Sequence, residues 1–229
     1  SIIGLATGTY TVCFDTSYAS GGSSTTGYLS QCYNDPSGTG TSTPPVSVTA
    51  GATTGGIDAA LAPAGAIAGT VTDTSGHGVS GATVYVYDQS GNRLYEATTT
   101  TGLNGAYAAT GLITGSYTVC FDASGASGGS SVTGYLSQCY KGVSWDGSST
   151  PPSGTTSVPV SAGSTKTGVN ASLTAGAAIA GTVTAASGAA DLSDVGVHVF
   201  DSTSTEVAYA STGSTGAYTV RGLPTGSYT

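Results

Sequence analysis

A segment of 30 residues occurs twice in this chain. Residues 4–33 read GLATGTYTVCFDTSYASGGSSTTGYLSQCY and residues 111–140 read GLITGSYTVCFDASGASGGSSVTGYLSQCY, so 25 of the 30 aligned positions are identical. The opening of this segment appears a third time, as GLPTGSYT at 222–229. Self-similarity of this kind is typical of tandem repeat proteins, in which one structural unit is copied along the chain.

A second marker sets the length of the repeat. The heptapeptide AIAGTVT occurs at 66–72 and again at 178–184, a spacing of 112 residues, which is the size of one small domain. The 229 residues therefore predict three successive pieces: the C-terminal part of a first β-sandwich repeat (1–62), a complete second repeat (63–175) and the N-terminal part of a third (176–229).

The joints between these pieces are short. They comprise Ala62–Gly65 and Thr174–Ala177. Long Gly/Ser linkers behave as flexible coils, whereas a joint of a few residues restricts the movement of one domain against the next. We expect the chain to be part of a longer array whose repeats follow one another at a near-constant angle.

The charge pattern argues against two classes of partner. Only 7% of the residues are charged, and 4 Lys and Arg against 12 Asp and Glu give a net charge of −8. Nucleic-acid binding depends on clustered Lys and Arg, and a helix needs ~20 apolar residues to span a bilayer. The chain has neither, so we expect no nucleic-acid partner and no membrane insertion of this segment.

The hydrophobic pattern predicts strands throughout. Thr83–Tyr87 alternates, with Val84 and Val86 on one face, and Tyr117–Phe121 reads as another strand. Arg93–Thr99 is expected to return as the hairpin partner of the first of these. Short strands separated by turn residues every 8–12 positions indicate an all-β sandwich.

Two stretches interrupt this pattern. Ser37–Pro45 and Ser144–Thr156 are rich in Ser, Thr, Gly and Pro, and each contains a Pro-Pro pair, which a central strand does not tolerate. They are expected to be loops. Their composition also suits O-glycosylation, although a solvated polar loop is the simpler interpretation.

The four cysteines come in two pairs of identical spacing. Cys13 and Cys32 are 19 residues apart, as are Cys120 and Cys139. An even number of cysteines at matched spacing predicts one disulfide within each repeat, whereas a zinc site would need four ligands close together and the chain has no C-x-x-C motif. Disulfides indicate an oxidising compartment, so we expect an extracellular or cell-surface location.

Catalytic residues are scarce. The only histidines, His77 and His198, occupy different positions in the repeat, and Asp15 and Asp122 fall in separate repeats. Nucleophilic and glycosidase chemistry both need groups held close together in one site. We therefore expect no enzyme, no cofactor and no metal ion.

Aromatic residues form the candidate contact surface. It comprises Tyr85, Tyr87, His198 and Phe200, the second pair occupying in the third repeat the positions of the first pair in the second. The simpler interpretation is aromatic packing on a sheet. The functional one is contact with a neighbouring domain, a second fibre or a sugar ring.

A family resemblance extends these expectations. The run AGTVTD…GVSGATVYV…GAY…GL…GSYTV in residues 65–174, together with both partial repeats, resembles the carboxypeptidase regulatory-like domain and the related Cna B-type domains of bacterial surface proteins. The resemblance implies tandem seven-stranded Greek-key (transthyretin-like) β-sandwiches with structural roles and no catalysis.

One departure from the resembling domains stands out. Many Cna B-type domains carry a Lys–Asn isopeptide bond whose lysine lies in the first strand, but the corresponding segment, Ala66–Thr72, has no lysine. Lys141 and Lys166 are the only lysines of the chain, and neither recurs in another repeat. The disulfide is expected to replace the isopeptide as the covalent clamp.

Together these observations predict an extracellular structural protein, a stalk or filament whose partners are other copies of itself or neighbouring repeats. The alternative is a carbohydrate- or surface-binding adhesion module of a secreted enzyme or adhesin, with surface polysaccharide as its partner. Asn170-Ala-Ser matches an N-glycosylation sequence, but its counterpart in the preceding repeat is Asp58, which favours an exposed strand end. A glycoprotein is left open chiefly by the Ser/Thr/Pro-rich loops.

Overall fold

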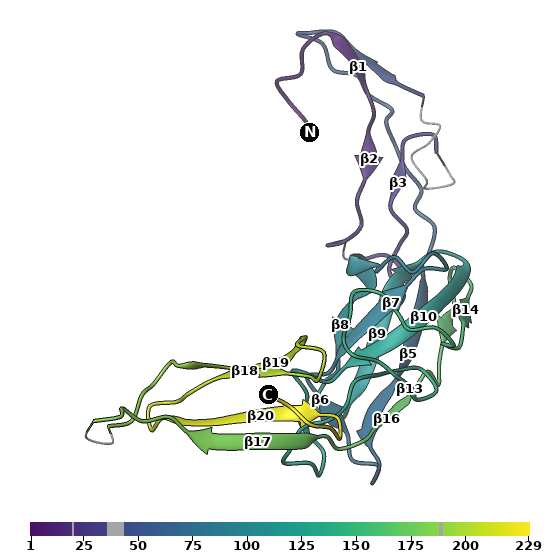
Figure 1. The fold of residues 1–229 in the computed structure, drawn as a ribbon. Coiled ribbons are helices and arrows are strands. Elements are labelled where there is room, and N and C mark those ends of the chain that lie inside the picture. Colours follow the sequence, from purple (N-terminus) through teal and green to yellow (C-terminus); the bar gives the residue numbers. More distant parts are fainter. Residues whose placement is uncertain (20, 36–43, 188–189) are drawn as a thin grey trace. The chain divides into compact units, whose positions relative to one another are not determined.

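The computed structural model describes residues 1–19, 21–35, 44–187 and 190–229, so most of the expected loop Ser37–Pro45 lies outside the described residues. Apart from one 3-10 turn, the regular secondary structure of the described residues consists of β-strands, which confirms the all-β prediction (Figure 1). It divides into two compact units, Ser1–Ile67 with Thr110–Gly115 and Pro159–Lys166, and Ala68–Ala109 with Ser116–Val158 and Thr167–Thr229.

The first unit contains two short antiparallel strand pairs. They are β1 (Gly8–Tyr10) with β4 (Val46–Val48) and β2 (Cys13–Phe14) with β3 (Gln31–Cys32). Both pairs lie in the N-terminal part of the ribbon, where β1, β2 and β3 are drawn in purple (Figure 1).

A six-stranded sheet forms the larger layer of the second repeat. Its order is β13-β12-β10-β7-β8, and β14 also pairs with β10. The central strands are β7 (Thr83–Tyr87), which matches the prediction, and β10 (Gly115–Asp122). The others are short: β8 (Thr99–Thr100), β12 (Gln138–Cys139), β13 (Val143–Ser144) and β14 (Val158–Val160).

A second sheet is built around the strand that carries the repeat marker. This strand, β5 (Gly65–Asp73), pairs in parallel with β15 (Thr165–Lys166) and β16 (Ala171–Leu173), and it also pairs with β9 (Ala106–Leu112). A small separate pair joins β6 (Val79–Ser80) to β11 (Ser127–Gly128).

The alternation of the central strands creates the core. Val84 faces the same side as Phe121, its register partner, and Val86 the same side as Val119, and all four are fully buried. Phe121 meets the ring of Tyr107 edge-on at a centroid distance of 5.7 Å. Burial of such side chains is the dominant favourable contribution to folding.

The expected strand Arg93–Thr99 is the main departure from the predicted elements. Arg93 makes one isolated bridge to Tyr87, after which the chain forms a 3-10 turn, η1 (Tyr95–Ala97), and only β8 pairs with β7. The guanidinium of Arg93 lies over two rings, 4.7 Å from the centroid of Tyr85 and 4.2 Å from that of Tyr95. This cation–π stacking accompanies the 3-10 turn that stands where a continuous hairpin was expected.

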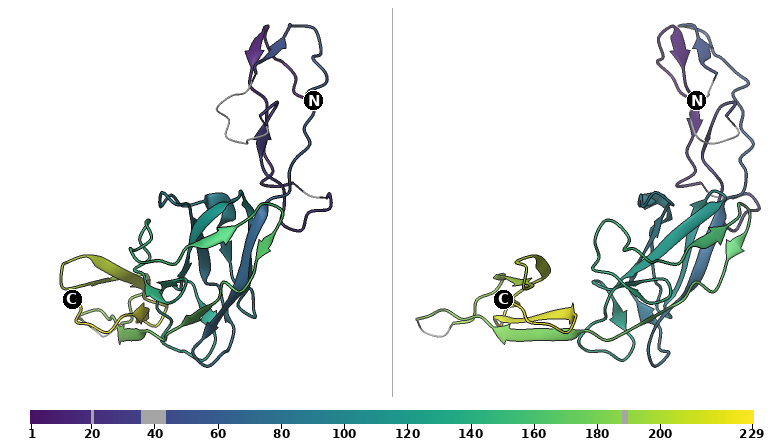
Figure 2. Two further views of the ribbon diagram at one scale, coloured as in Figure 1. Left: turned by 90° about the vertical axis from the view of Figure 1, so that its right-hand side faces the viewer. Right: turned by 45° about the vertical axis from the view of Figure 1, so that its right-hand side comes forward.

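The third repeat contributes two antiparallel pairs. They are β17 (Ala177–Thr182) with β20 (Ala217–Leu223), and β18 (Gly196–Phe200) with β19 (Glu206–Ser211), and the views in Figures 1 and 2 agree that the two pairs face each other. Val199, Val220 and Leu223 form the buried cluster between them.

A glycine turn is built identically in the second and third repeats. Gly105 has φ +73° and accepts a hydrogen bond from the amide of Val71 at 2.8 Å; Gly216 has φ +66° and accepts one from Val183 at 2.9 Å. A Cβ atom at either glycine would overlap the carbonyl oxygen of the same valine. The Gly-Ala-Tyr sequence of each repeat therefore reflects a close backbone approach that only glycine allows.

Candidate functional site: the joints between repeats

The loop that precedes the second cysteine of each repeat is held by hydrogen bonds from its own side chains. In the first repeat the amide of Thr26 donates to Ser24 Oγ at 3.2 Å, and Ser24 Oγ donates to the carbonyl of Gly27 at 2.7 Å. The hydroxyl of Tyr28 accepts from the amides of Ser23 and Ser24 at 2.8 and 3.1 Å. These contacts give the loop one conformation and leave Thr26 directed at the joint.

Thr26 connects three segments of the chain. Its hydroxyl donates to the carbonyl of Ala64, in the joint, and its own carbonyl accepts from the amide of Gly111, in the second repeat, at 3.4 Å. The side chain is buried, with 5% of its surface exposed. A buried hydroxyl is retained at little cost only when it is hydrogen-bonded, as this one is.

Backbone pairing completes the first joint. Tyr28 forms an antiparallel bridge with Pro63. Leu29 donates to the carbonyl of Ala62 at 2.9 Å, and Ala64 donates to that of Gly27 at 3.0 Å. The joint segment is thus an added strand beside the loop rather than a free linker.

The second joint repeats these contacts atom for atom. Thr133 Oγ1 donates to the carbonyl of Gly176 at 2.7 Å, and the carbonyl of Thr133 accepts from the amide of Gly222 at 2.9 Å. Tyr135 bridges to Ala175 as Tyr28 does to Pro63. The remaining backbone bonds, Leu136 to Thr174 at 2.9 Å and Gly176 to Gly134 at 3.0 Å, are also the counterparts of those in the first joint.

Sequence reasoning did not identify these residues as a site. In the sequence, Tyr28 and Tyr33 flank the second cysteine of the first repeat, as Tyr135 and Tyr140 do in the second. A signal was present, because the motif Ser-Ser-x-Thr-Gly-Tyr-Leu is identical in both copies except at x, where Thr25 stands in one and Val132 in the other. The variable position, Thr25 or Val132, is exposed to solvent. The invariant threonine that follows it donates the hydrogen bond to the joint.

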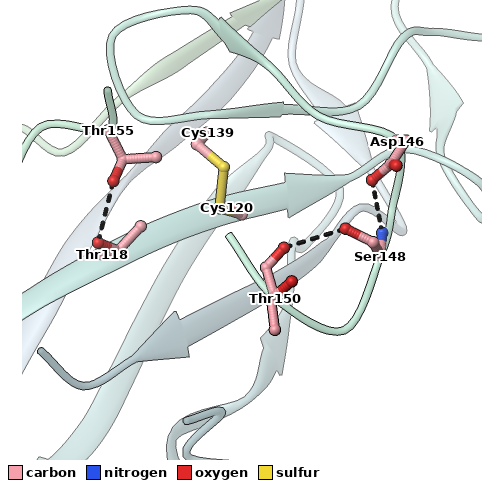
Figure 3. Close-up of a disulfide and its surroundings, with 7 residues drawn as sticks. All are labelled: Thr118, Cys120, Cys139, Asp146, Ser148, Thr150 and Thr155. Carbon is pink, nitrogen blue, oxygen red and sulfur yellow. Dashed lines mark hydrogen bonds between the residues drawn. A yellow bond between two sulfur atoms is a disulfide. The ribbon is translucent and has the colours of Figure 1, made fainter. Parts of the chain in front are cut away.

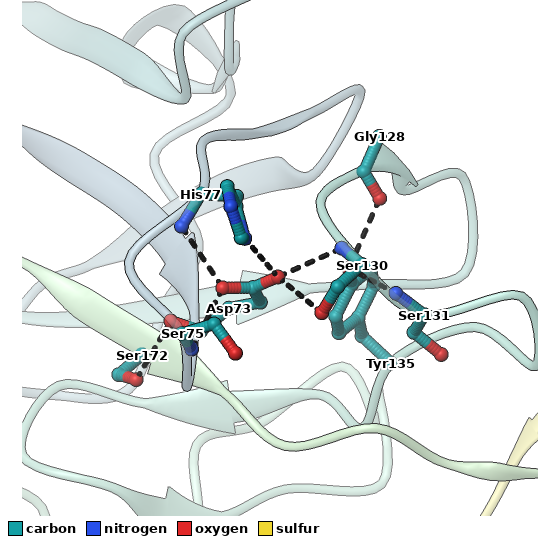
Figure 4. Close-up of polar contacts among 8 residues, drawn as sticks. All are labelled: Asp73, Ser75, His77, Gly128, Ser130, Ser131, Tyr135 and Ser172. Carbon is teal, nitrogen blue, oxygen red and sulfur yellow. Dashed lines mark hydrogen bonds and ion pairs between the residues drawn. The ribbon is translucent and has the colours of Figure 1, made fainter.

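Asp73, at the end of β5, ties the joint loop of the second repeat to this strand (Figure 4). Its buried carboxylate accepts from the amide and hydroxyl of Ser130, both at 2.7 Å, and from the amides of Ser75 and His77 at 2.8 and 2.9 Å. Tyr135 then donates to the carbonyl of Gly128 at 3.0 Å and so closes the loop.

The same cluster holds a serine, a histidine and an aspartate, but not in a catalytic order. Ser130 Oγ donates to Asp73 Oδ2, and His77 Nδ1 lies 3.3 Å from the same oxygen. In a catalytic triad the histidine takes the proton of the serine and the carboxylate orients the histidine. Here the serine is bound by the carboxylate itself, so the arrangement fixes a loop and activates no nucleophile.

Stability of the second repeat should fall at acid pH through Asp73. The hydrogen bond from Ser130, followed by those from the backbone amides, holds the pKa of this carboxyl well below its ordinary value of 3.8. A lowered folded-state pKa adds stability above the unfolded pKa, and that stability is lost as pH falls below about 4. Urea unfolding at several pH values should show this loss, and Asp73→Asn should be less stable at pH 7 and less sensitive to acid. An unchanged acid dependence in the variant would contradict the assignment.

Both cysteine pairs form disulfides across neighbouring strands. Cys13 is bonded to Cys32, and Cys120 to Cys139. In the second repeat Cys120 lies between two register partners, Tyr85 on β7 and Cys139 on β12. Figure 3 shows its disulfide with Cys139. The disulfide therefore attaches the outer strands β12 and β13 to the centre of the large sheet.

The predicted contact surface is partly covered by the repeat that carries it. Trp145 meets the rings of Tyr85 and Tyr87 edge-on at 5.8 and 6.4 Å, and Tyr87 is fully buried in one cluster with the disulfide and Trp145. Tyr87 therefore cannot contribute to an exposed surface as expected.

The counterparts in the third repeat are more open. The side chain of His198 is 48% exposed, lies 3.0 Å from Glu206, and packs on the rings of Phe200 and Tyr209. Tyr85, His198 and Phe200 remain candidates for an intermolecular contact.

Over residues 1–19, 21–35, 44–187 and 190–229, no three His, Cys, Asp or Glu side chains gather closely enough to hold a metal ion. Within the same part of the chain, no helix is long and apolar enough to cross a membrane.

Comparison with known proteins finds a family match for the second repeat. The family model of the carboxypeptidase regulatory-like domain matches residues 66–174, while no curated protein matches the chain. Among solved structures, the Bacillus anthracis TIE protein is 17% identical, with 72% of this chain and 27% of that chain covered and a TM-score of 0.33. A streptococcal ancillary pilin is 12% identical, with 72% and 52% covered and a TM-score of 0.36.

The chain thus spans less than two thirds of the length of both of these structures. The matched residues coincide with the segment that begins in β5, carries the Gly-Ala-Tyr turn and ends at β16. Residues 66–174 of this chain belong to the carboxypeptidase regulatory-like domain family.

Proposed function

We propose that the chain is part of an extracellular structural array, a stalk or the body of a filament, in which segments 1–62, 63–175 and 176–229 are successive repeats. The observation that carries the proposal is the joint, which is made twice with the same backbone and threonine contacts. A contact that joins the end of one unit to the start of the next, and does not close on itself, extends without limit.

Two other features suit this role. A disulfide in the first segment and another in the second resist unfolding in an oxidising, protease-rich setting, which favours a location outside the cell. Carboxypeptidase regulatory-like domains are a non-catalytic kind of domain, and the Ser130–Asp73–His77 cluster is arranged to hold a loop. We propose no catalytic activity for this segment.

A second candidate function is a carbohydrate-binding accessory module. One observation favours it: an open groove of about 280 Å³ whose lining residues include several that carry hydroxyl groups, together with Asp88. Such groups can hydrogen-bond the hydroxyls of a sugar. The serine and threonine residues of the lining are Ser116, Thr118, Thr155 and Ser157.

Electron microscopy of the natural full-length protein separates the two. The structural proposal expects straight particles with a regular axial spacing that corresponds to one or two repeats. Beads joined at random angles, together with binding of the chain to members of a glycan array, would contradict it and favour the accessory module.

A further inference from the structure

We propose that the hydroxyl of Thr26, and of Thr133 in the next copy, is a latch by which each repeat recognises the repeat that follows it. The partner of this surface is a second repeat of the same chain. The inference rests on the proposed function as an array, and adds the residue and the atoms that set how consecutive repeats join.

The donor side of the latch is a single side chain in a prepared position. Thr26 Oγ1 is buried and donates to the carbonyl of Ala64, while the carbonyl of Thr26 receives the amide of Gly111. One residue thus contacts both the joint and the Gly-Leu turn of the following repeat. Valine has the same shape as threonine but cannot donate, so it would leave the carbonyl of Ala64 without this partner.

The other side of the latch consists of backbone atoms alone, one that accepts and one that donates. It requires a carbonyl in the joint and an amide at a glycine with positive φ, which is +81° at Gly111 and +73° at Gly222. A Cβ atom at Gly222 would lie 3.0 Å from the carbonyl oxygen of Tyr135, so a side chain there would crowd the joint. Any following repeat with a short joint and this glycine offers the same atoms, and the array can therefore extend without a new interface.

The hydrogen bond from the glycine amide to the threonine carbonyl is shorter at the second joint than at the first, and a residue found only at the second joint adds a further bond. At the second joint the amide of Gly222 lies 2.9 Å from its acceptor, against 3.4 Å for Gly111 at the first. Arg221 Nε also donates to the carbonyl of Val132 at 3.1 Å, and the corresponding residue of the second repeat is Thr110. We expect the amide of Gly222 to exchange more slowly than that of Gly111.

Amide hydrogen exchange of the whole 229-residue chain tests the latch. In Thr26→Val, the amides of Ala64 and Gly111 are expected to exchange about tenfold faster than in the unchanged chain, because the loop is no longer held to the joint. Thr26→Ser keeps the hydroxyl and should restore slow exchange.

The neighbouring residue supplies a matched control. Thr25→Val makes the same substitution at an exposed position where the other copy naturally has Val132, and it should leave both amides unchanged. The amide of Tyr33, which donates to the carbonyl of Val12 at 2.8 Å, reports whether the first repeat itself stays folded. Equal exchange in Thr26→Val and Thr25→Val would overturn the proposal.

A second variant keeps the test decisive if Thr26→Val disrupts its own repeat. Thr133→Val should accelerate exchange of Gly176 and Gly222 while the fluorescence of Trp145, in the core of the same repeat, stays native. Unchanged exchange there would overturn the latch. If the particles are regular but the variants do not change amide exchange, the array is supported and the latch is wrong. If the variants change amide exchange but the particles are not regular, the latch is supported and the array is wrong.

Discussion

Gly105→Ala is expected to unfold the second repeat at temperatures where the unchanged chain is native. Gly105 has φ +73°, and a Cβ atom would overlap the carbonyl oxygen of Val71, whose amide is bonded to Gly105 at 2.8 Å. A left-handed backbone alone costs an L residue about 1–2 kcal/mol. The overlap with a backbone atom of β5 must then be relieved by moving the strand, so the total loss is expected to exceed about 4 kcal/mol.

Gly76→Ala is the matched control for this substitution. Gly76 has φ +87°, but no heavy atom lies within 4 Å of the position its Cβ would take. It therefore carries the backbone cost without the overlap, and about 1–2 kcal/mol should be lost. Urea unfolding followed by the fluorescence of Trp145, the only tryptophan of the chain, measures both variants. Equal losses would show that the turn does not need its close approach to β5.

Removal of the Cys120–Cys139 bond should cost the second repeat about 3 kcal/mol. The bond closes a loop of 19 residues, for which restriction of the unfolded chain accounts for stabilisation of about this size. The double variant Cys120→Ala with Cys139→Ala should lower the urea midpoint, and Trp145 should report it directly because it belongs to the same buried cluster.

The equivalent change in the first repeat provides the comparison. Cys13→Ala with Cys32→Ala removes a bond of the same spacing that lies in the other unit. Trp145 fluorescence should then follow an unchanged unfolding curve. If both double variants shifted this curve equally, the two repeats would unfold as one cooperative unit and the site-specific explanation would be wrong.

Local sequence was sufficient for much of the fold. The alternation of Thr83–Tyr87 and of Tyr117–Phe121 predicted strands that the structure contains, because period-2 burial is a property of a few neighbouring residues. The expected strand Arg93–Thr99 failed for the converse reason. There Arg93 stacks on two rings from different segments and the chain forms a 3-10 turn, although the local preference is for an extended chain.

The cysteine pairing also followed from sequence, whereas the surroundings of the disulfide did not. Matched spacing points to one bond per repeat, but nothing in the letters places Trp145 over Tyr87, 58 positions earlier. An alternating strand indicates which residues share a face, but not whether a later loop will cover that face. For this reason Tyr87 was expected on an exposed surface and is instead buried.

By itself, the sequence determined that the chain is all-β and carries repeated segments, and it predicted short joints between them, since repetition, strand period and turn residues are all local features of the sequence. Tertiary structure alone decided what those joints are. Thr26 meets Ala64 across 38 residues and Asp73 meets Ser130 across 57, and both contacts depend on hydrogen bonds between segments that only folding brings together. The identical residues of the two copies indicated a repeated contact. That the threonine hydroxyl makes this contact is visible only in the structure, where its acceptor is a carbonyl of the joint.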